Sequence, residues 1–292
     1  MGKFSIKELE QLSGIKAHTI RIWEKRHKLI APKRTTTNIR YYSDDDLKKI
    51  INVSLLNNHG VKISKIVKLS EEELNTEVFQ LSEEKTNSEI HIDQLVLSMI
   101  DLEEEQFEKV LSRLTLKVGF ERAILEVVYP FLEKIGVLWH TGNISPTQEH
   151  FITNLIRQKI IVAIDSLPIP SKLSKRAILF LPENELHELG LLFCHYITRQ
   201  FGLRTYYLGQ SIPYRDLKSI CEAHNPHYIL TTISSSPQGS VIQGYLEKLC
   251  SDFSSAKVLV SGRALKKLTL THPANLSLFE NAQGLKRLLE GV

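Results

Sequence analysis

The chain has 292 residues, enough for two or three domains of ordinary size, and 42% of them are hydrophobic, which allows substantial cores. No apolar run reaches the length of about 18 residues that a membrane-spanning helix needs, and the N-terminus lacks the apolar stretch of a signal peptide. Three widely spaced cysteines without a CxxC pair disfavour a disulfide framework and a cysteine zinc site. These features predict a cytoplasmic protein with no membrane partner.

The net charge of +4 conceals an asymmetry along the chain. Residues 1–68 carry 15 Lys and Arg against 6 Asp and Glu, residues 69–170 carry 8 against 18, and residues 171–292 carry 14 against 9. A basic head before an acidic middle is typical of one nucleic-acid-binding module on a longer chain. The alternative, a basic face that is merely solvated, would need no particular motif in the head.

The head has the pattern of a winged helix-turn-helix. Ser5 is placed as the N-cap of a helix over Ile6–Ser13, Gly14 breaks that helix, and a short basic helix follows over about residues 18–26. The second helix fits the recognition helix that enters the major groove, and two extended pieces around a Thr/Asn turn predict a hairpin, or wing. The expected DNA contacts are the polar side chains of these two parts: Lys16, His18, Arg21 and Lys25 around the helix, and Lys33, Arg34, Arg40 and Tyr41 in the wing.

Two short strings in this head are specific. TIRIWE at 19–24 and RYYSDDD at 40–46 resemble the DNA-binding domain of MerR-type regulators, and the resemblance covers about the first 70 residues. It implies a double-stranded DNA operator and a homo-oligomer, dimer or tetramer, because such domains bind palindromic sites. Trp23 and the stem of Arg26 are expected to pack inward. The segment 70–73 is expected to end the head, with no long coiled-coil helix after it.

The acidic middle predicts a bundle of four helices, because apolar residues recur at helical spacing and the connections are short. The expected helices are Ser88–Met99, Leu102–Val118, Phe120–Trp139 and Thr147–Ser166.

A Trp–x9–Glu–His motif lies at the end of this bundle: Trp139 is followed ten residues later by Glu149 and His150. Alone, it would be explained by a core tryptophan and a surface histidine. The spacing resembles the cap domain of cobalamin-binding transcriptional photoreceptors. That resemblance implies that Trp139 lies over the upper face of the cofactor and that Glu149 and His150 border the upper-ligand cavity. His140 is a candidate cobalt ligand after light has removed the upper group, or else an ordinary helix-end histidine.

From residue 175 onward, strand and helix patterns alternate, which predicts a doubly wound parallel sheet of Rossmann-like architecture. The expected strands are Ala177–Leu181, Thr205–Leu208, Tyr228–Ile233, Lys257–Val260 and Leu276–Phe279. The expected helices are Leu189–Phe201, Tyr214–Ala223, Val241–Phe253, Ala264–Thr269 and Ala282–Leu289. Ligands of such sheets bind beyond the carboxyl ends of the strands.

Three short motifs fall at those ends: Glu185-x-His187-x-x-Gly190, Thr231-x-Ile233 and Ser261-Gly262, separated by gaps of 40 residues (191–230) and 27 residues (234–260). They resemble the cobalamin-binding signature Asp-x-His-x-x-Gly, Ser-x-Leu and Gly-Gly.

The resemblance implies that His187 is the lower cobalt ligand and that Glu185 orients it and raises its basicity. Gly190 then lets the corrin approach, Thr231 hydrogen-bonds the nucleotide tail, and Gly262 leaves room for that tail. Ser261 departs from the signature, because it adds a side chain where the tail passes. A loop histidine on a flavodoxin-like regulator domain is the alternative for His187.

The sequence therefore predicts three domains: a MerR-type winged helix-turn-helix at 1–70, a four-helix cobalamin cap at 75–170, and a cobalamin-binding α/β domain at 174–292. The predicted function is a DNA-binding regulator, more specifically a repressor, controlled by adenosylcobalamin and responsive to light through a change of oligomeric state. No catalytic set is visible, so an enzyme is not expected. One alternative is a regulator that has lost the cofactor and senses a protein partner. Another is a corrinoid shuttle for methyl transfer, against which the DNA-binding head argues.

Overall fold

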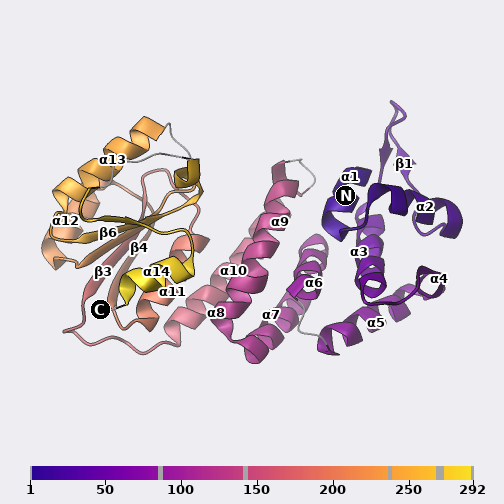
Figure 1. The fold of residues 1–292 in the computed structure, drawn as a ribbon, viewed down its shortest axis with the longest axis horizontal. Helices are drawn as coiled ribbons and strands as arrows, with labels where there is room; N and C mark the ends of the chain where they lie inside the picture. Colours follow the sequence, from indigo (N-terminus) through magenta and orange to yellow (C-terminus); the bar gives the residue numbers. More distant parts are fainter. Residues whose placement is uncertain (1, 85–87, 141–143, 236–238, 268–272, 291–292) are drawn as a thin grey trace. The chain divides into compact units, whose positions relative to one another are not determined.

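The structure of the chain is a computed structural model that describes residues 2–84, 88–140, 144–235, 239–267 and 273–290. By its internal packing the chain divides into two compact units, Met1–Thr153 and Asn154–Val292. The first is helical apart from one small hairpin, and the second contains a parallel sheet covered by helices (Figure 1). Within the described residues, no helix combines the length and apolar character needed to cross a bilayer.

The head has the predicted winged helix-turn-helix arrangement. Its elements are α1 (Ile6–Ser13), α2 (Ala17–His27), β1 (Lys33–Arg34), β2 (Arg40–Tyr41), α3 (Asp44–Asn58) and α4 (Ile63–Ile66). Ser5 and Ser43 both begin their helices with capping boxes. In each, the serine hydroxyl accepts from the backbone N–H of the acidic residue three positions later, and the carboxylate of that residue accepts from the backbone N–H of the serine. Gly14 ends α1 in the left-handed conformation. Trp23 is buried as predicted, whereas Arg26 is exposed as a whole residue.

A helix, α5 (Glu71–Glu84), follows the head where the sequence interpretation expected an end. Ser70 starts it: the backbone N–H of Ser70 donates to the Glu73 carboxylate, and the backbone N–H of Glu73 donates to the Ser70 hydroxyl. The Ser-Glu-Glu-Glu string is therefore a helix start rather than a boundary. Leu74 and Val78 are buried, and α5 packs against α3.

The bundle consists of α6 (Ser88–Asp101), α7 (Glu104–Val118), α8 (Phe120–Ala123), α9 (Tyr129–His140) and α10 (Pro146–Asp165). The third predicted helix is interrupted by a π-helical turn, Ile124–Val128, between α8 and α9. The second predicted helix begins two residues late, because Leu102 has a left-handed backbone with φ +56° and separates α6 from α7. The apolar positions that predicted the bundle form its core, with Phe107 and Phe131 fully buried.

The second unit contains the predicted parallel sheet. Its strands are β3 (Arg176–Pro182), β4 (Arg204–Ile212), β5 (Tyr228–Thr232), β6 (Lys257–Ser261) and β7 (Leu276–Leu278), in the order β4-β3-β5-β6-β7. Its helices are α11 (Leu189–Gln200), α12 (Tyr214–His224), α13 (Gly239–Asp252) and α14 (Ala282–Leu289). The expected helix at 264–269 is a 3-10 turn, Arg263–Lys267, and its last two residues lie outside the described residues.

The strand order places a topological switch point at β3 and β5. The chain leaves β3 on one side to form β4 and returns on the other side to form β5. Helices α12 and α13 cover one face of the sheet, and α11 and α14 pack together on the other (Figure 1). Because the connections from β3 and β5 diverge, their carboxyl ends border the crevice in which such sheets bind ligands.

Candidate functional site

At the carboxyl end of β3, a histidine is held by a buried carboxylate. The ring Nδ1 of His187 lies 2.6 Å from Oε1 of Glu185, and the backbone N–H of His187 donates to the same oxygen at 3.0 Å. The Glu185 side chain is 5% exposed, whereas the His187 side chain is 70% exposed. When Nδ1–H donates to the carboxylate, the lone pair of the neutral imidazole is on Nε2, which is the form that ligates a metal.

Glu185 also fixes the loop that follows β5. Its second oxygen, Oε2, accepts from the backbone N–H groups of Ser234 at 2.8 Å and Ser235 at 2.7 Å, and from the Ser235 hydroxyl at 2.7 Å. Burial raises the pKa of the Glu185 carboxyl, but the hydrogen bonds from Ser235 and His187 outweigh that effect and lower the pKa to about 2. Glu185 is therefore ionised and joins the two loops at the switch point.

Two buried threonines, Thr231 and Thr232, end β5. The hydroxyl oxygens of Thr231 and Thr232 have no hydrogen-bond partner among the described residues, although Thr231 is 0% and Thr232 6% exposed. Buried hydroxyls normally find a partner, and successive strand residues point to opposite faces of a sheet, so each hydroxyl marks its own position at which a further group could supply one. Thr231 was predicted as a ligand contact. Thr232 was not, and it lies on the face of the sheet opposite to Thr231.

The two glycines of the predicted site have different surroundings. A Cβ on Gly190, in the first turn of α11, would meet no atom within 4 Å, so the backbone there is open to a bulky group. Gly262 has φ +135°, and a Cβ there would lie 2.0 Å from the carbonyl oxygen of Ile233. The chain itself therefore requires glycine at 262, because β5 and β6 end side by side. Ile233 is buried, and its N–H donates to the carbonyl of Ser261, which is half-buried.

Beside His187 lies a second buried carboxylate, Glu188, which the sequence interpretation did not single out. Its oxygens accept from Nε of Arg157 and from the hydroxyl of Tyr207, both at 2.8 Å. Gln210 donates to the carbonyl of Leu186 at 2.8 Å and so holds the same turn from β4. These partners come from α10 and β4, far from residues 185–190 in sequence, so no local sequence pattern could have predicted the contacts.

The other half of the predicted site is described only in part. Glu149 is half-buried and His150 is exposed, both in the first turn of α10. Trp139 and His140 form the last residues of α9, but their side chains lie outside the described part of the structure, as do residues 141–143. Their predicted positions at the cofactor therefore remain predictions.

The predicted DNA contacts lie on α2 and the hairpin. His18, Arg21 and Lys25 recur every three or four residues along α2 and are all exposed. Exposed Arg26 adds a further cation to this helix. Lys16 precedes the helix as its N-cap residue and pairs with Glu10 at 3.0 Å.

In the hairpin, Lys33, Arg34 and Arg40 are exposed, and Arg34 pairs with Arg40 in the strand register. Arg34 also donates to the side-chain oxygen of Asn38 at 2.6 Å, a neutral partner that leaves its charge available. Tyr41 is half-buried beneath the ammonium of Lys3, which lies 5.4 Å from its ring centroid. A basic helix and a basic hairpin together are suited to a duplex with its phosphates.

Comparison with known families confirms the two predicted modules. Residues 4–73 match the family described as MerR HTH family regulatory protein, and residues 91–163 match the B12 binding domain family. Among curated relatives, the HTH-type transcriptional repressor CarH of Myxococcus xanthus is 27% identical over 80% of this chain and 79% of its own length. The repressor CarA of the same organism is 25% identical over 77% of this chain and 74% of its own length. The chain is thus homologous to transcriptional repressors over most of its length.

Among solved structures, the monomethylamine corrinoid protein of Methanosarcina barkeri superposes with a TM-score of 0.55. The match covers 70% of this chain and all of that protein at 16% identity, so it supports the fold alone: a helical region followed by a parallel sheet.

Proposed function

We propose that this chain is a transcription regulator whose affinity for a double-stranded DNA operator is set by bound adenosylcobalamin. The observation that carries the proposal is the pair Glu185–His187, an exposed imidazole whose Nδ1 is fixed by a buried, ionised carboxylate. That arrangement presets Nε2 of His187 as a metal ligand. His187 is therefore proposed as the lower cobalt ligand, with Glu185 as the residue that orients it.

The residues around the pair fit a corrinoid. Gly190 leaves open space at the start of α11, where a large planar ring would approach. The hydroxyl of Thr231, which has no partner among the described residues, would hydrogen-bond the nucleotide tail. Ile233, Ser261 and Gly262 complete the strand ends along which that tail would pass, although the backbone contact at Gly262 explains this glycine without any ligand. We therefore propose that Gly262 is required mainly by the fold, and that space for the tail is a secondary consequence.

On the DNA side, the proposed contacts remain Lys16, His18, Arg21, Lys25, Lys33, Arg34, Arg40 and Tyr41. Basic side chains of this kind bind phosphates and base edges from a recognition helix and a wing. A palindromic operator calls for at least a dimer, so a homo-oligomer, dimer or tetramer, belongs to the proposal. A DNA target and three buried, free cysteines accord with a cytoplasmic location.

The proposed signal is light. Adenosylcobalamin supplies a cobalt–carbon bond that light breaks, which is chemistry of the cofactor rather than of the fold. From this chain, Trp139, Glu149 and His150 would surround the upper group, and His140 would replace it at the cobalt after illumination. Size-exclusion chromatography of the loaded protein tests this: the dark sample should elute as a larger oligomer than the illuminated one. The same elution in dark and light would contradict light control while leaving cobalamin sensing intact.

The cofactor itself is tested by absorption spectroscopy. The purified chain incubated with adenosylcobalamin should become coloured, with a spectrum of histidine-ligated cobalt. His187→Ala should bind weakly or show the spectrum of an unligated lower face. A colourless parent protein after incubation would favour the alternative, a regulator that keeps the fold and senses a protein partner.

A further inference from the structure

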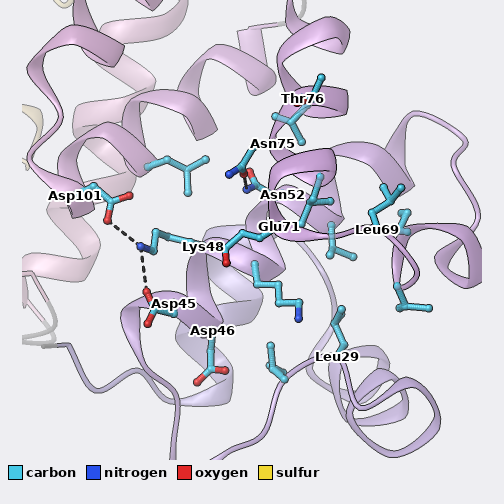
Figure 2. Close-up of a pocket in the computed structure, with 18 of the residues that line it drawn as sticks. Leu29, Asp45, Asp46, Lys48, Asn52, Leu69, Glu71, Asn75, Thr76 and Asp101 are labelled. Carbon is cyan, nitrogen blue, oxygen red and sulfur yellow. Dashed lines mark hydrogen bonds and ion pairs between the residues drawn. The ribbon is translucent and has the colours of Figure 1, made fainter.

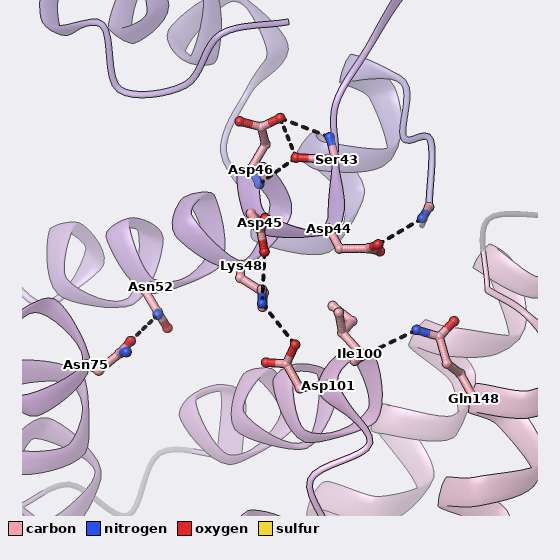
Figure 3. A network of polar contacts seen from close by, with 11 residues as sticks. Ser43, Asp44, Asp45, Asp46, Lys48, Asn52, Asn75, Ile100, Asp101 and Gln148 are labelled. Carbon is pink, nitrogen blue, oxygen red and sulfur yellow. Dashed lines mark hydrogen bonds and ion pairs between the residues drawn. The ribbon is translucent and has the colours of Figure 1, made fainter. Parts of the chain in front are cut away.

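In the first unit, the head and the bundle meet through a small polar junction. The ammonium of Lys48, in α3, lies 3.1 Å from the carboxylate of Asp45 on its own helix and 2.9 Å from that of Asp101 at the end of α6 (Figure 3). The Lys48 side chain is 26% exposed and the Asp101 side chain 40% exposed. An ion pair this accessible contributes little stability, on the order of 0.2–1 kcal/mol, and is easily exchanged for water.

The packing beside this ion pair is incomplete. A cavity of about 870 Å³ lies among α3, α5 and α6, and residues lining it include Lys48, Asn52, Asn75 and Asp101 (Figure 2). The side-chain amide of buried Asn52 donates to the side-chain oxygen of Asn75 at 2.9 Å. The side-chain oxygen of Asn52 has no partner among the described residues. Because a cavity lies on this side, the Lys48–Asp101 ion pair is a specific contact that joins α3 to α6 beside it.

The same turn of α6 is held from the other side by α10. The side-chain amide of Gln148 donates to the carbonyl of Ile100, the residue before Asp101, at 3.2 Å (Figure 3). Gln148 also closes the capping box of α10, because its side-chain oxygen accepts from the backbone N–H of Ser145 at 3.1 Å. It directly precedes Glu149 and His150, which the proposed function places at the upper side of the cofactor.

We infer that residues 100–101 are the point through which the cofactor state of α10 positions the DNA-reading head, with Lys48, Asp101 and Gln148 as positioning residues. The inference rests on the proposed function. A shift of the first turn of α10 would move the carbonyl of Ile100, and with it the carboxylate that holds α3. Since α3 follows the hairpin directly, its tilt sets how α2 and the wing meet a duplex.

The test compares operator affinity with and without adenosylcobalamin in the dark, using the full chain. In Asp101→Asn and in Lys48→Met, the ratio of the two affinities should fall by about twofold to fivefold, the range expected from an exposed ion pair. Glu104→Gln removes a carboxylate charge at a neighbouring exposed position and should keep the parental ratio.

A second readout needs no cofactor. In the unloaded chain, amide hydrogen exchange in α3 and in the last turn of α6 should become about twofold to fivefold faster in Asp101→Asn but not in Glu104→Gln. If Asp101→Asn still binds cobalamin and has the same ratio of operator affinities as the parent, the inference is wrong but the proposed function stands. A parent whose operator affinity does not respond to cobalamin overturns the proposed function and the inference with it.

Discussion

Glu185 has two tasks at the scale of single residues. One oxygen orients His187, and the other accepts three hydrogen bonds from Ser234 and Ser235 in the loop after β5. A carboxylate that serves both loops couples the position of the proposed cobalt ligand to the strand end that carries the unpartnered threonines. The resemblance to the cobalamin-binding signature implied the first task, but nothing in the sequence indicated the second, because Ser235 lies 50 residues further along the chain.

Glu185→Gln is expected to weaken cobalamin binding without abolishing it. The amide keeps the size of the side chain but loses the charge that fixes Nδ1–H of His187, and losses of this kind are typically about 10–100-fold. Spectrophotometric titration with adenosylcobalamin in the dark measures the change. Glu183→Gln removes the same charge from an exposed position two residues earlier and should bind like the parent; equal affinity in both variants would remove Glu185 from the site.

The low pKa of Glu185 also predicts a pH dependence of stability. Because the pKa of about 2 in the folded chain lies below the value near 4.3 of an unfolded chain, the carboxylate stabilises the fold fully above that unfolded value. This contribution is lost as the pH falls from about 4 through about 2. Urea unfolding across this range should therefore show a smaller pH slope in Glu185→Gln than in the parent, followed by a probe in the second unit. The same slope in both proteins would mean that the carboxyl is not held as described.

At the scale of elements, one glycine is required by the fold and another is proposed to be required by the ligand. Gly262→Ala should destabilise the second unit by more than about 1–3 kcal/mol, because its backbone conformation excludes a side chain and its Cβ would meet the Ile233 carbonyl. Gly190→Ala should instead leave stability unchanged or raised by about 0.5–1 kcal/mol, since alanine favours a helix. It should nevertheless weaken cobalamin binding.

Chemical denaturation and cobalamin titration of both glycine variants measure these two effects. If Gly190→Ala binds cobalamin as tightly as the parent, the corrin does not approach the start of α11. If Gly262→Ala is as stable as the parent, the close contact between the ends of β5 and β6 is wrong.

The hairpin makes its own prediction. Arg34 is an exposed cation whose described hydrogen bonds go to neutral groups of Asn38, so Arg34→Ala should weaken binding to all DNA sequences alike. The slope of log affinity against log salt should fall by about 0.9, the contribution of one phosphate contact. Lys218→Ala removes an exposed charge from α12 in the other unit and serves as the control. An unchanged slope in Arg34→Ala would exclude this residue from the interface.

Elements with strong local signals were predictable from the sequence. The five predicted strands are present, and Ser5 caps its helix as expected. Departures occur where the signal is weak or tertiary. Leu102 adopts a left-handed conformation that no residue preference favours, and the π-helical turn at Ile124–Val128 leaves the apolar spacing nearly unchanged. The α5 helix was missed although its capping box is visible at Ser70, because the string of acids was taken for a boundary.

At the scale of the whole molecule, a region that matches the MerR HTH family is followed by one that matches the B12 binding domain family and by a parallel sheet. The charge follows this division: the basic head carries the exposed cations of α2 and the hairpin, and the acidic region that follows lacks such an excess. An acidic bundle does not compete for phosphates, so binding to DNA is left to the head. The proposal is that the cofactor makes DNA binding by the head dependent on the rest of the chain.

The most direct measurement is the dark operator affinity of the full chain with and without one equivalent of adenosylcobalamin, on an operator selected from random DNA by the purified protein. We predict that adenosylcobalamin changes the affinity of the parent by at least about fivefold, the low end of ordinary allosteric coupling, and leaves that of His187→Ala unchanged. Equal affinities with and without the cofactor, in a parent protein that has bound it, would contradict the account.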